Sequence, residues 1–119
     1  MNGLVINLTH SVDDPDRTSV AMVVAGAAVA SNQTTTVFLS SEGTRLAQTG
    51  VAETLHEAGF SPVGDLVSSF VDAGGSFLVC SPCAKKRDIA EGDLIKGASI
   101  VGGATLVALL ADGAESLSF

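Results

Sequence analysis

Short aliphatic runs alternate with segments of helical pattern along the whole chain, and this alternation is the strongest constraint on the fold. Buried strands are indicated by GLVINLT (3–9), TTTVFLS (34–40), SFLVC (76–80), GASIVG (97–102) and ESLSF (115–119). Helical patterns lie between them, in residues 13–32, 64–75 and 103–113. Strands that alternate with helices pair in parallel through right-handed crossovers. We therefore expect one α/β domain over residues 1–119, with a mostly parallel five-stranded sheet.

The segment Val20–Ala30 is apolar on every side of the helix that it would form. Such a helix is normally covered on two sides, here by the sheet and by another helix or subunit. Apolar residues make up 46% of the 119-residue chain, which adds to the surface that must be buried. We therefore expect a homo-oligomer. Because a bilayer requires roughly 20 apolar residues, no membrane span is predicted.

The net charge is −7, with only six basic residues. A negative protein is poorly suited to bind phosphate backbones, so nucleic acid is not an expected partner. The opening MNGLVINLTH has no charged segment before its apolar run, and that run is too short for a secretion signal. We therefore expect a cytoplasmic protein.

The stretch CSPCAKKRD (80–88) holds both cysteines of the chain and half of its basic residues. Cys80 ends a predicted strand, and chemistry in parallel α/β sheets gathers at the carboxyl ends of the strands. Ser81 is a natural N-cap and Pro82 a natural first helical residue, which places Cys83 in the first turn of a helix. A helix N-terminus stabilises anions and lowers the pKa of a thiol. The pattern therefore predicts a reactive thiolate.

Three basic residues follow the second cysteine: Lys85, Lys86 and Arg87. They would add positive potential beside the sulfurs and stabilise an anion there, although such a run is often only a solvated helix face. A cysteine at a strand end is also often just a small buried hydrophobe. We favour functional chemistry, because cysteine spacing, position in the fold and adjacent charge occur together in a reducing compartment.

Other cysteine chemistries fit this pattern less well. A tetrahedral zinc site needs four ligands, and here one cysteine pair is accompanied by the isolated His10 and His56. We predict neither a metal nor a cofactor. CSPC followed by Ala-Lys looks like the CxPCK stretch of thioredoxin-like oxidoreductases, but that fold carries its motif early and a cis-proline after it. In this chain the motif comes late and no proline follows Pro82.

Further polar residues follow the first two predicted strands, at the edge that carries Cys80. His10 follows the first strand, and Ser41 and Glu42 follow the second. If the second and third strands are neighbours, Ser41 or Glu42 lies nearest to the sulfur, and His10 is two strands away, roughly 10 Å. If the first and third strands are neighbours, His10 is placed to shuttle a proton. Residues 40–43 also suit the start of a helix, and a single histidine after a strand is typical of an exposed loop.

The chain resembles the DsrE/DsrF-like (DsrEFH) proteins, which include small sulfurtransferase subunits of sulfur-relay systems. The resemblance covers nearly the whole length. It rests on the opening strand and its long helix, on the strand-end cysteine with basic residues after it, and on VFLSSEGTRLA (37–47) and IVGGATLVALLADGAESLSF (100–119). It implies a three-layer α/β/α domain with flavodoxin-like layering, and assembly as trimers or hexamers.

The resemblance also implies roles for the cysteines. Sulfur carriers of this family accept a persulfide on a cysteine at this strand end, which is the position of Cys80. Cys83 stands where those carriers commonly have a small residue. Arg87 matches the family's basic residue, whereas Asp88 replaces a frequent glycine.

The expected function is therefore persulfide carriage or thiol redox chemistry, sulfurtransferase-like, acting through Cys80. Cys83 could resolve the persulfide as an internal disulfide and release sulfide, which would require an external thiol. The expected partner is a sulfur-donor or acceptor protein, or a low-molecular-weight thiol. The alternatives are a thioredoxin-like disulfide oxidoreductase and a non-catalytic oligomeric binding module.

Overall fold

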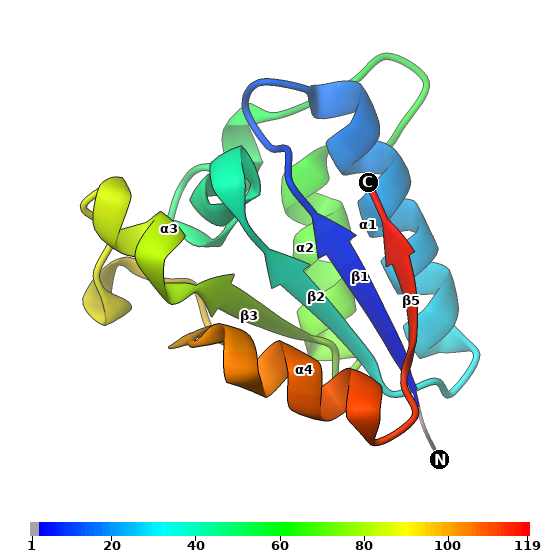
Figure 1. The fold of residues 1–119 in the computed structure, drawn as a ribbon. Coiled ribbons are helices and arrows are strands. Elements are labelled where there is room, and N and C mark those ends of the chain that lie inside the picture. The colour runs from blue at the N-terminus through cyan, green and yellow to red at the C-terminus, as the bar shows by residue number, and fades with distance from the viewer. Residues whose placement is uncertain (1–2) are drawn as a thin grey trace.

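The computed structural model describes residues 3–119 and contains a five-stranded sheet (Figure 1). The strands are β1 (Leu4–Leu8), β2 (Thr35–Leu39), β3 (Ser76–Cys80), β4 (Ala98–Val101) and β5 (Glu115–Ser118). Their order across the sheet is β4-β3-β2-β1-β5, and every pair is parallel. Each strand lies within a run that the sequence pattern predicts, so the expected α/β class is confirmed.

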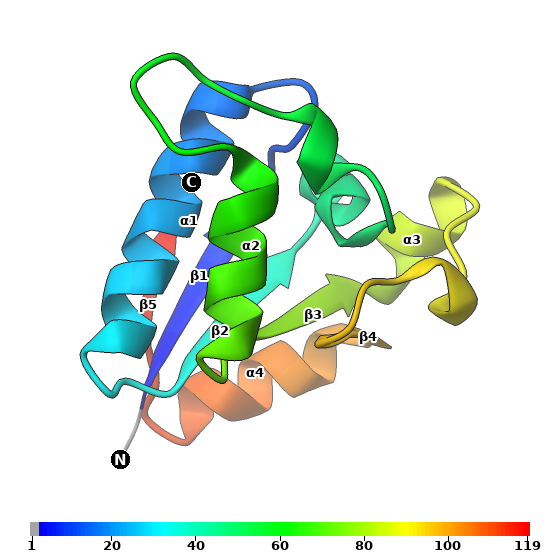
Figure 2. The same ribbon diagram turned by 180° about the vertical axis from the view of Figure 1, so that it is seen from behind.

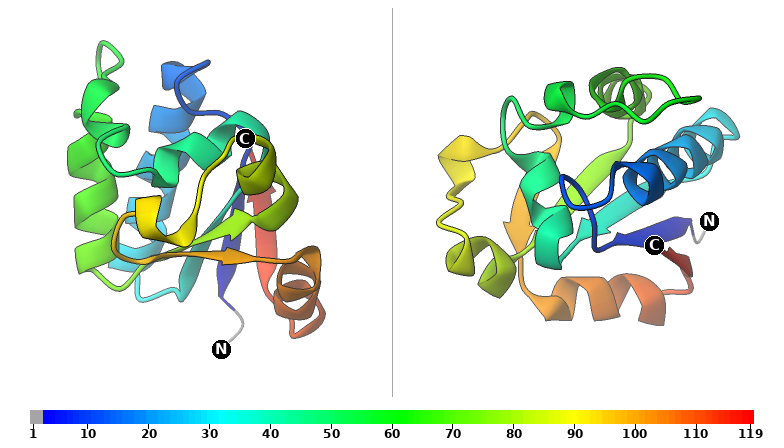
Figure 3. Two further views of the ribbon diagram at one scale, coloured as in Figure 1. Left: turned by 90° about the vertical axis from the view of Figure 1, so that its left-hand side faces the viewer. Right: turned by 90° about the horizontal axis from the view of Figure 1, so that it is seen from above.

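Helices lie on both faces of this sheet. α1 (Pro15–Ala30) and α2 (Val63–Asp72) lie side by side on one face (Figure 2), and α4 (Gly103–Ala111) crosses the other (Figure 1; Figure 3, right). The strands β1 to β4 are added in one direction, so right-handed crossovers place α1 and α2 on the same face. The chain then returns across the sheet to β5, which places α4 on the opposite face. The three-layer arrangement is thereby confirmed.

The hydrophobic core lies between the sheet and the layer formed by α1 and α2. Its largest fully buried side chains include Ile6, Leu8, Met22, Phe70 and Phe77. The rings of Phe70 in α2 and Phe77 in β3 meet edge to face, with their centroids 5.3 Å apart. This packing holds β3, the strand that ends at Cys80, against the helical layer.

α1 begins as its sequence predicts. The Asp14 side chain accepts a hydrogen bond from the Arg17 amide at 3.0 Å, and Pro15 is the first helical residue. The helix packs against the sheet and against α2. The outer side of α1 is exposed to solvent, as the 44% exposure of Val23 shows. Within this chain, α2 and the sheet therefore cover only part of the apolar surface of α1.

The opposite face of the sheet is thinly covered. α4 has the apolar sequence GATLVALLA, yet none of its residues is buried, and Val107 is 64% exposed. All four residues of β5 are exposed as well. Among residues 3–119, no helix, α4 included, is both long enough and apolar enough to cross a bilayer.

Candidate functional site

The carboxyl ends of β1, β2 and β3 bring the predicted site residues to one edge of the sheet (Figure 3, right). Because β2 lies between β1 and β3, the segment with Ser41 and Glu42 follows the strand next to that of Cys80, and His10 is two strands away. The His10 ring nitrogen Nδ1 pairs instead with the Asp13 carboxylate at 2.8 Å. Of the two alternatives that the sequence leaves open, the structure therefore has the one with Ser41 beside the sulfurs.

The two cysteines occupy the junction between β3 and the short helix α3 (Ser81–Lys86). Cys80 is the last strand residue and also the N-cap of α3, so the helix begins one residue earlier than predicted and Ser81 is not its N-cap. The strand turns directly into the helix, which leaves no separate capping residue. Cys83 is the third helical residue, and both cysteines are free thiols with partly exposed side chains.

A second short helix, the 3₁₀ helix η1 (Ser41–Ala47), lies against α3 at this edge. The Ser41 amide donates a hydrogen bond to the Cys83 Sγ at 3.4 Å. Ser41 has a φ of 51°, a left-handed conformation that costs a non-glycine residue roughly 1–2 kcal/mol. Strain of this kind is retained where the surrounding structure uses it. At Ser41 the left-handed conformation accompanies the hydrogen bond from its amide to the Cys83 sulfur.

The position of η1 is set by contacts with the end of β1. The Ser40 amide donates to the Leu8 carbonyl at 3.2 Å, and the Ser11 hydroxyl donates to the Glu42 carbonyl. At Gly43 the backbone passes so close to β1 that a Cβ atom would lie 2.9 Å from the Leu8 carbonyl carbon. Glycine is therefore required at this position to bring η1 down onto the sheet edge.

The charged side chains of the site form one connected cluster. The Glu42 carboxylate accepts hydrogen bonds from Arg87 Nε at 2.8 Å and from Arg45 Nε at 3.0 Å. Arg87 Nη1 also donates to the Cys83 carbonyl at 3.2 Å, and the Arg87 side chain is only 11% exposed. The bonds from Arg87 and Arg45 hold the pKa of Glu42 below its usual value. Glu42 thus ties η1 to the end of α3, and the cluster keeps a net positive charge beside the sulfurs.

The predicted basic run divides into two kinds of residue. Arg87 is bonded to the Cys83 carbonyl, and its charge acts to lower the pKa of both thiols. Lys85 and Lys86 lie exposed in the last turn of α3. They present positive charge to solvent.

The pKa values of the two thiols are shifted in opposite directions. Burial and the neighbouring Cys83 sulfur raise the pKa of Cys80. Burial also acts to raise the pKa of Cys83, but hydrogen bonds from the Cys80 thiol and the Ser41 amide outweigh it. The Arg87 charge and the Thr44 hydroxyl act in the same direction, so the pKa of Cys83 lies below that of an ordinary thiol. Cys83 is therefore the thiol of the pair that ionises first, and Cys80 keeps its proton to higher pH.

Thr44 is a site residue that the sequence analysis misses. Its side chain is fully buried, and among residues 3–119 its hydroxyl has no partner with full hydrogen-bond geometry. The group whose ionised form it stabilises is the Cys83 sulfur. The available signal is the spacing of Ser41 and Thr44, because residues three apart share one side of a 3₁₀ helix.

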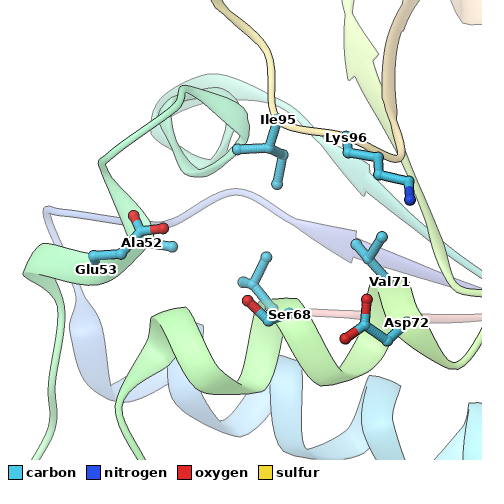
Figure 4. A pocket seen from close by; sticks show the side chains of 8 residues that line it. Ala52, Glu53, Ser68, Val71, Asp72, Ile95 and Lys96 are labelled. Atoms are coloured by element: carbon cyan, nitrogen blue, oxygen red, sulfur yellow. The ribbon is translucent and has the colours of Figure 1, made fainter.

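A separate hollow of about 230 Å³ lies between α2 and the segment that leads into β4 (Figure 4). Its lining consists of Ala52, Glu53, Val67, Ser68, Val71, Asp72, Ile95 and Lys96. Neither cysteine contributes to it. Among residues 3–119, no three histidine, cysteine or acidic side chains converge on a point where one ion would bind.

The sequence profile of the DsrE/DsrF-like family matches residues 3–119. The chain belongs to the DsrE/DsrF-like family. Membership in this family suggests a sulfur-relay role. The DsrE/DsrF-like resemblance that the sequence motifs carry is thus confirmed over almost the entire chain.

Solved structures share this fold. The ychN protein of E. coli superposes with a TM-score of 0.83 over 100% of both chains, at 18% sequence identity. MTH1491 of Methanobacterium thermoautotrophicum, a protein of unknown function, has a TM-score of 0.72 over 98% of this chain and 97% of its own, also at 18% identity. The uncharacterized protein MJ0760 of Methanocaldococcus jannaschii is 29% identical over 103 residues, which is 87% of this chain. The aligned part is 37% of MJ0760, so the chain spans little more than a third of that relative.

Proposed function

We propose that this protein carries or transfers sulfane sulfur through the Cys80–Cys83 pair. The observation that carries the proposal is a pair of free cysteines at the sheet edge, one of which has the Ser41 amide at 3.4 Å from its sulfur. The pKa of that cysteine, Cys83, is lowered, whereas the pKa of Cys80 is raised. A thiolate is the form that attacks sulfur, and a neighbouring thiol is the usual means of releasing it again. Both side chains are partly exposed, so a donor can reach them.

The proposed transfer is balanced in sulfur and charge. A cysteine thiolate attacks the outer sulfur of a donor persulfide, R–S–SH. A sulfur–sulfur bond forms on the cysteine, the donor's sulfur–sulfur bond breaks, and its electron pair leaves as R–S⁻. The cysteine is then a persulfide, which can pass its outer sulfur to an acceptor thiolate by the same reaction.

The second cysteine provides another outcome. When its sulfur attacks the Sγ of the persulfidated cysteine, an internal disulfide forms and hydrosulfide, HS⁻, leaves. A low-molecular-weight thiol or a dithiol protein must then reduce the disulfide. We place this chemistry in the cytoplasm, where a reducing environment keeps both cysteines as thiols.

The proposed macromolecular partner is a donor or acceptor protein with an acidic surface near its own sulfur. Lys85 and Lys86 are exposed on α3, immediately beyond Cys83. The protein as a whole is acidic, with a net charge of −7, so these residues form a local positive area on a negative molecule. That contrast would orient a docking partner toward the cysteines.

We also propose that the chain forms a homo-oligomer, a trimer or a hexamer. In the single chain, exposed apolar side chains remain on α1, α4 and β5, namely Val23, Val107, Leu110 and Leu117. A small domain gains stability when such surfaces are buried against other subunits.

The test of the sulfur-transfer function is a loading experiment. The reduced protein is incubated with glutathione persulfide, and the peptide that contains both cysteines is analysed by mass spectrometry. We expect a gain of one sulfur atom, or disulfide formation with release of sulfide, and neither in the double variant Cys80→Ser/Cys83→Ser. Disulfide exchange with oxidised glutathione but no reaction with the persulfide would instead establish a disulfide oxidoreductase. Unreactive thiols would establish a non-catalytic binding module.

A further inference from the structure

We infer that Cys83 is the sulfur that attacks the donor, that the Thr44 hydroxyl and the Ser41 amide are the fixed donors that stabilise its charge, and that Cys80 is the resolving thiol. This assignment rests on the proposed sulfur-transfer function. It reverses the roles that the family resemblance implies, in which Cys80 accepts the sulfur and Cys83 resolves the persulfide.

The first observation is the direction of the Ser41 amide. It is aimed at the Cys83 Sγ from a different segment of the chain, 42 residues away, and not from the cysteine's own helix. α3 is too short to supply a helix dipole of any strength, with six residues in all. η1 therefore supplies a donor that the cysteine's own helix does not, because the left-handed turn at Ser41 places one amide at the Cys83 sulfur.

The second observation is the unpaired hydroxyl of Thr44. A buried hydroxyl without a partner destabilises the folded protein, because it has lost its hydrogen bonds to water. The Thr44 side chain is 0% exposed, and η1, the helix that contains it, packs against β2, β3 and α3. A neutral thiol is a weak acceptor for this hydroxyl, whereas a thiolate is a strong one. The arrangement is thus better satisfied when the Cys83 sulfur is charged.

The third observation is the asymmetry between the two sulfurs. The Cys83 sulfur accepts a hydrogen bond at 3.4 Å from the Ser41 amide, a donor that belongs to another segment of the chain. The pKa of Cys80 is instead raised by burial and by the neighbouring Cys83. Cys80 is therefore the thiol that keeps its proton to higher pH.

The two steps then follow in a fixed order. The Cys83 thiolate takes the outer sulfur from R–S–SH and releases R–S⁻. In the resolving step, the Cys80 sulfur bonds to the Cys83 Sγ and the bond between Cys83 and the outer SH group breaks. The SH group leaves with the proton of the Cys80 thiol, as H₂S. In carrier mode, the outer sulfur on Cys83 passes to an acceptor before Cys80 reacts.

The test measures which thiol ionises first. The reduced protein is alkylated with iodoacetamide over a range of pH, and peptide mass spectrometry gives the rate at each cysteine. We expect the midpoint for Cys83 to lie below that for Cys80. In Thr44→Val, which keeps the shape and removes the hydroxyl, the Cys83 midpoint should rise by about one pH unit, the effect of one hydrogen bond to a charged sulfur. Thr44→Ser, which restores the hydroxyl, should return the midpoint toward the wild-type value.

Two results overturn the inference: a lower midpoint at Cys80 than at Cys83, or the same Cys83 midpoint in Thr44→Val and wild type. Circular dichroism of each variant shows whether it is folded, and Thr44→Ser controls for loss of packing. Persulfide loading of single variants is the second measurement. We expect Cys80→Ser to accumulate persulfide on Cys83 and Cys83→Ser to lose loading, and loading of Cys83→Ser at the wild-type rate would also overturn the order.

Failure of the inference and failure of the proposed function have different signatures. Alkylation needs no sulfur donor, so it reports the charge on Cys83 even if the protein transfers no sulfur. Wild type that does not load sulfur, but shows the expected alkylation profile, refutes the sulfur-transfer function alone. Wild type that loads sulfur, but alkylates first at Cys80, refutes the order of the two cysteines alone.

Discussion

The contact between η1 and β1 makes a sharp prediction about Gly43. In Gly43→Ala the new Cβ would lie 2.9 Å from the Leu8 carbonyl carbon and 3.2 Å from the His10 nitrogen, and nearer still to the Leu8 carbonyl oxygen. These are backbone atoms of β1 and of the segment after it, so no side chain can rotate away. Ordinary contact begins near 3.4 Å, so relief of the clash with the carbonyl carbon alone needs a shift of η1 of about 0.5 Å, and the nearer carbonyl oxygen requires a larger one. Overpacking of this kind lowers the free energy of unfolding by about 2–3 kcal/mol.

The same substitution at Gly26 is a matched control with the opposite expected sign. Gly26 lies inside α1, and a Cβ there would have no atom within 4 Å. Alanine is favoured over glycine in a helix interior, so Gly26→Ala should raise the free energy of unfolding by about 0.5–1 kcal/mol. The chain has no tryptophan or tyrosine, so urea unfolding is best followed by far-UV circular dichroism. All variants are compared at one protein concentration, because assembly adds to apparent stability.

A displaced η1 would also carry Ser41 and Thr44 away from the Cys83 sulfur. Gly43→Ala should therefore raise the alkylation midpoint of Cys83 as well as reduce stability, whereas Gly26→Ala should change the midpoint little. If Gly43→Ala unfolds within about 0.5 kcal/mol of wild type, with the same dependence on urea, the close approach of η1 to β1 is not what positions the site.

Other predictions concern charge and assembly. The folded-state pKa of Glu42 is lowered by its bonds to Arg87 and Arg45, so its contribution to stability is present above its ordinary value of 4.5 and is lost as the pH falls through the folded-state pKa. Glu42→Gln should lower the free energy of unfolding at pH 7 by about 1 kcal/mol, a modest value because the Glu42 side chain is 36% exposed. The difference in unfolding free energy from wild type should shrink below pH 4.5. A difference that stays constant with pH would contradict this account. Val107→Asp places a charge on the exposed face of α4, so size-exclusion chromatography with light scattering should show a smaller assembly than wild type, and an unchanged mass would exclude α4 from the subunit interface.

The fold follows from the sequence to a large extent because its signals are local. Asp14 and Pro15 define the start of α1, and the aliphatic runs define the strands, without knowledge of the rest of the chain. The parallel arrangement follows from the alternation of strands and helices. The side of α1 at Val23 shows the limit of such reasoning: an apolar pattern indicates that a surface is to be buried, but not which surface covers it.

The site is predictable only in part. Parallel strands all end at the same edge, so Cys80, Ser41 and His10 could be assigned to one edge from sequence. The order of the strands could not be predicted from sequence, because it depends on the packing of the whole sheet. This order brings Ser41 to the sulfurs and keeps His10 away from them. Thr44 carries little signal, since a threonine in a short helix is ordinary until burial leaves its hydroxyl unpaired.

The sequence by itself determined that a parallel sheet would present two thiols, three residues apart, at the start of a helix and at the carboxyl edge. Only the tertiary structure decided which of the two thiols has the lower pKa. The spacing of Cys80 and Cys83 is a local property of the chain, whereas a thiol pKa depends on the donors within a few ångströms of the sulfur. Here one such donor, the Ser41 amide, belongs to η1, a segment some 40 residues away that reaches Cys83 only when β2 and β3 pair.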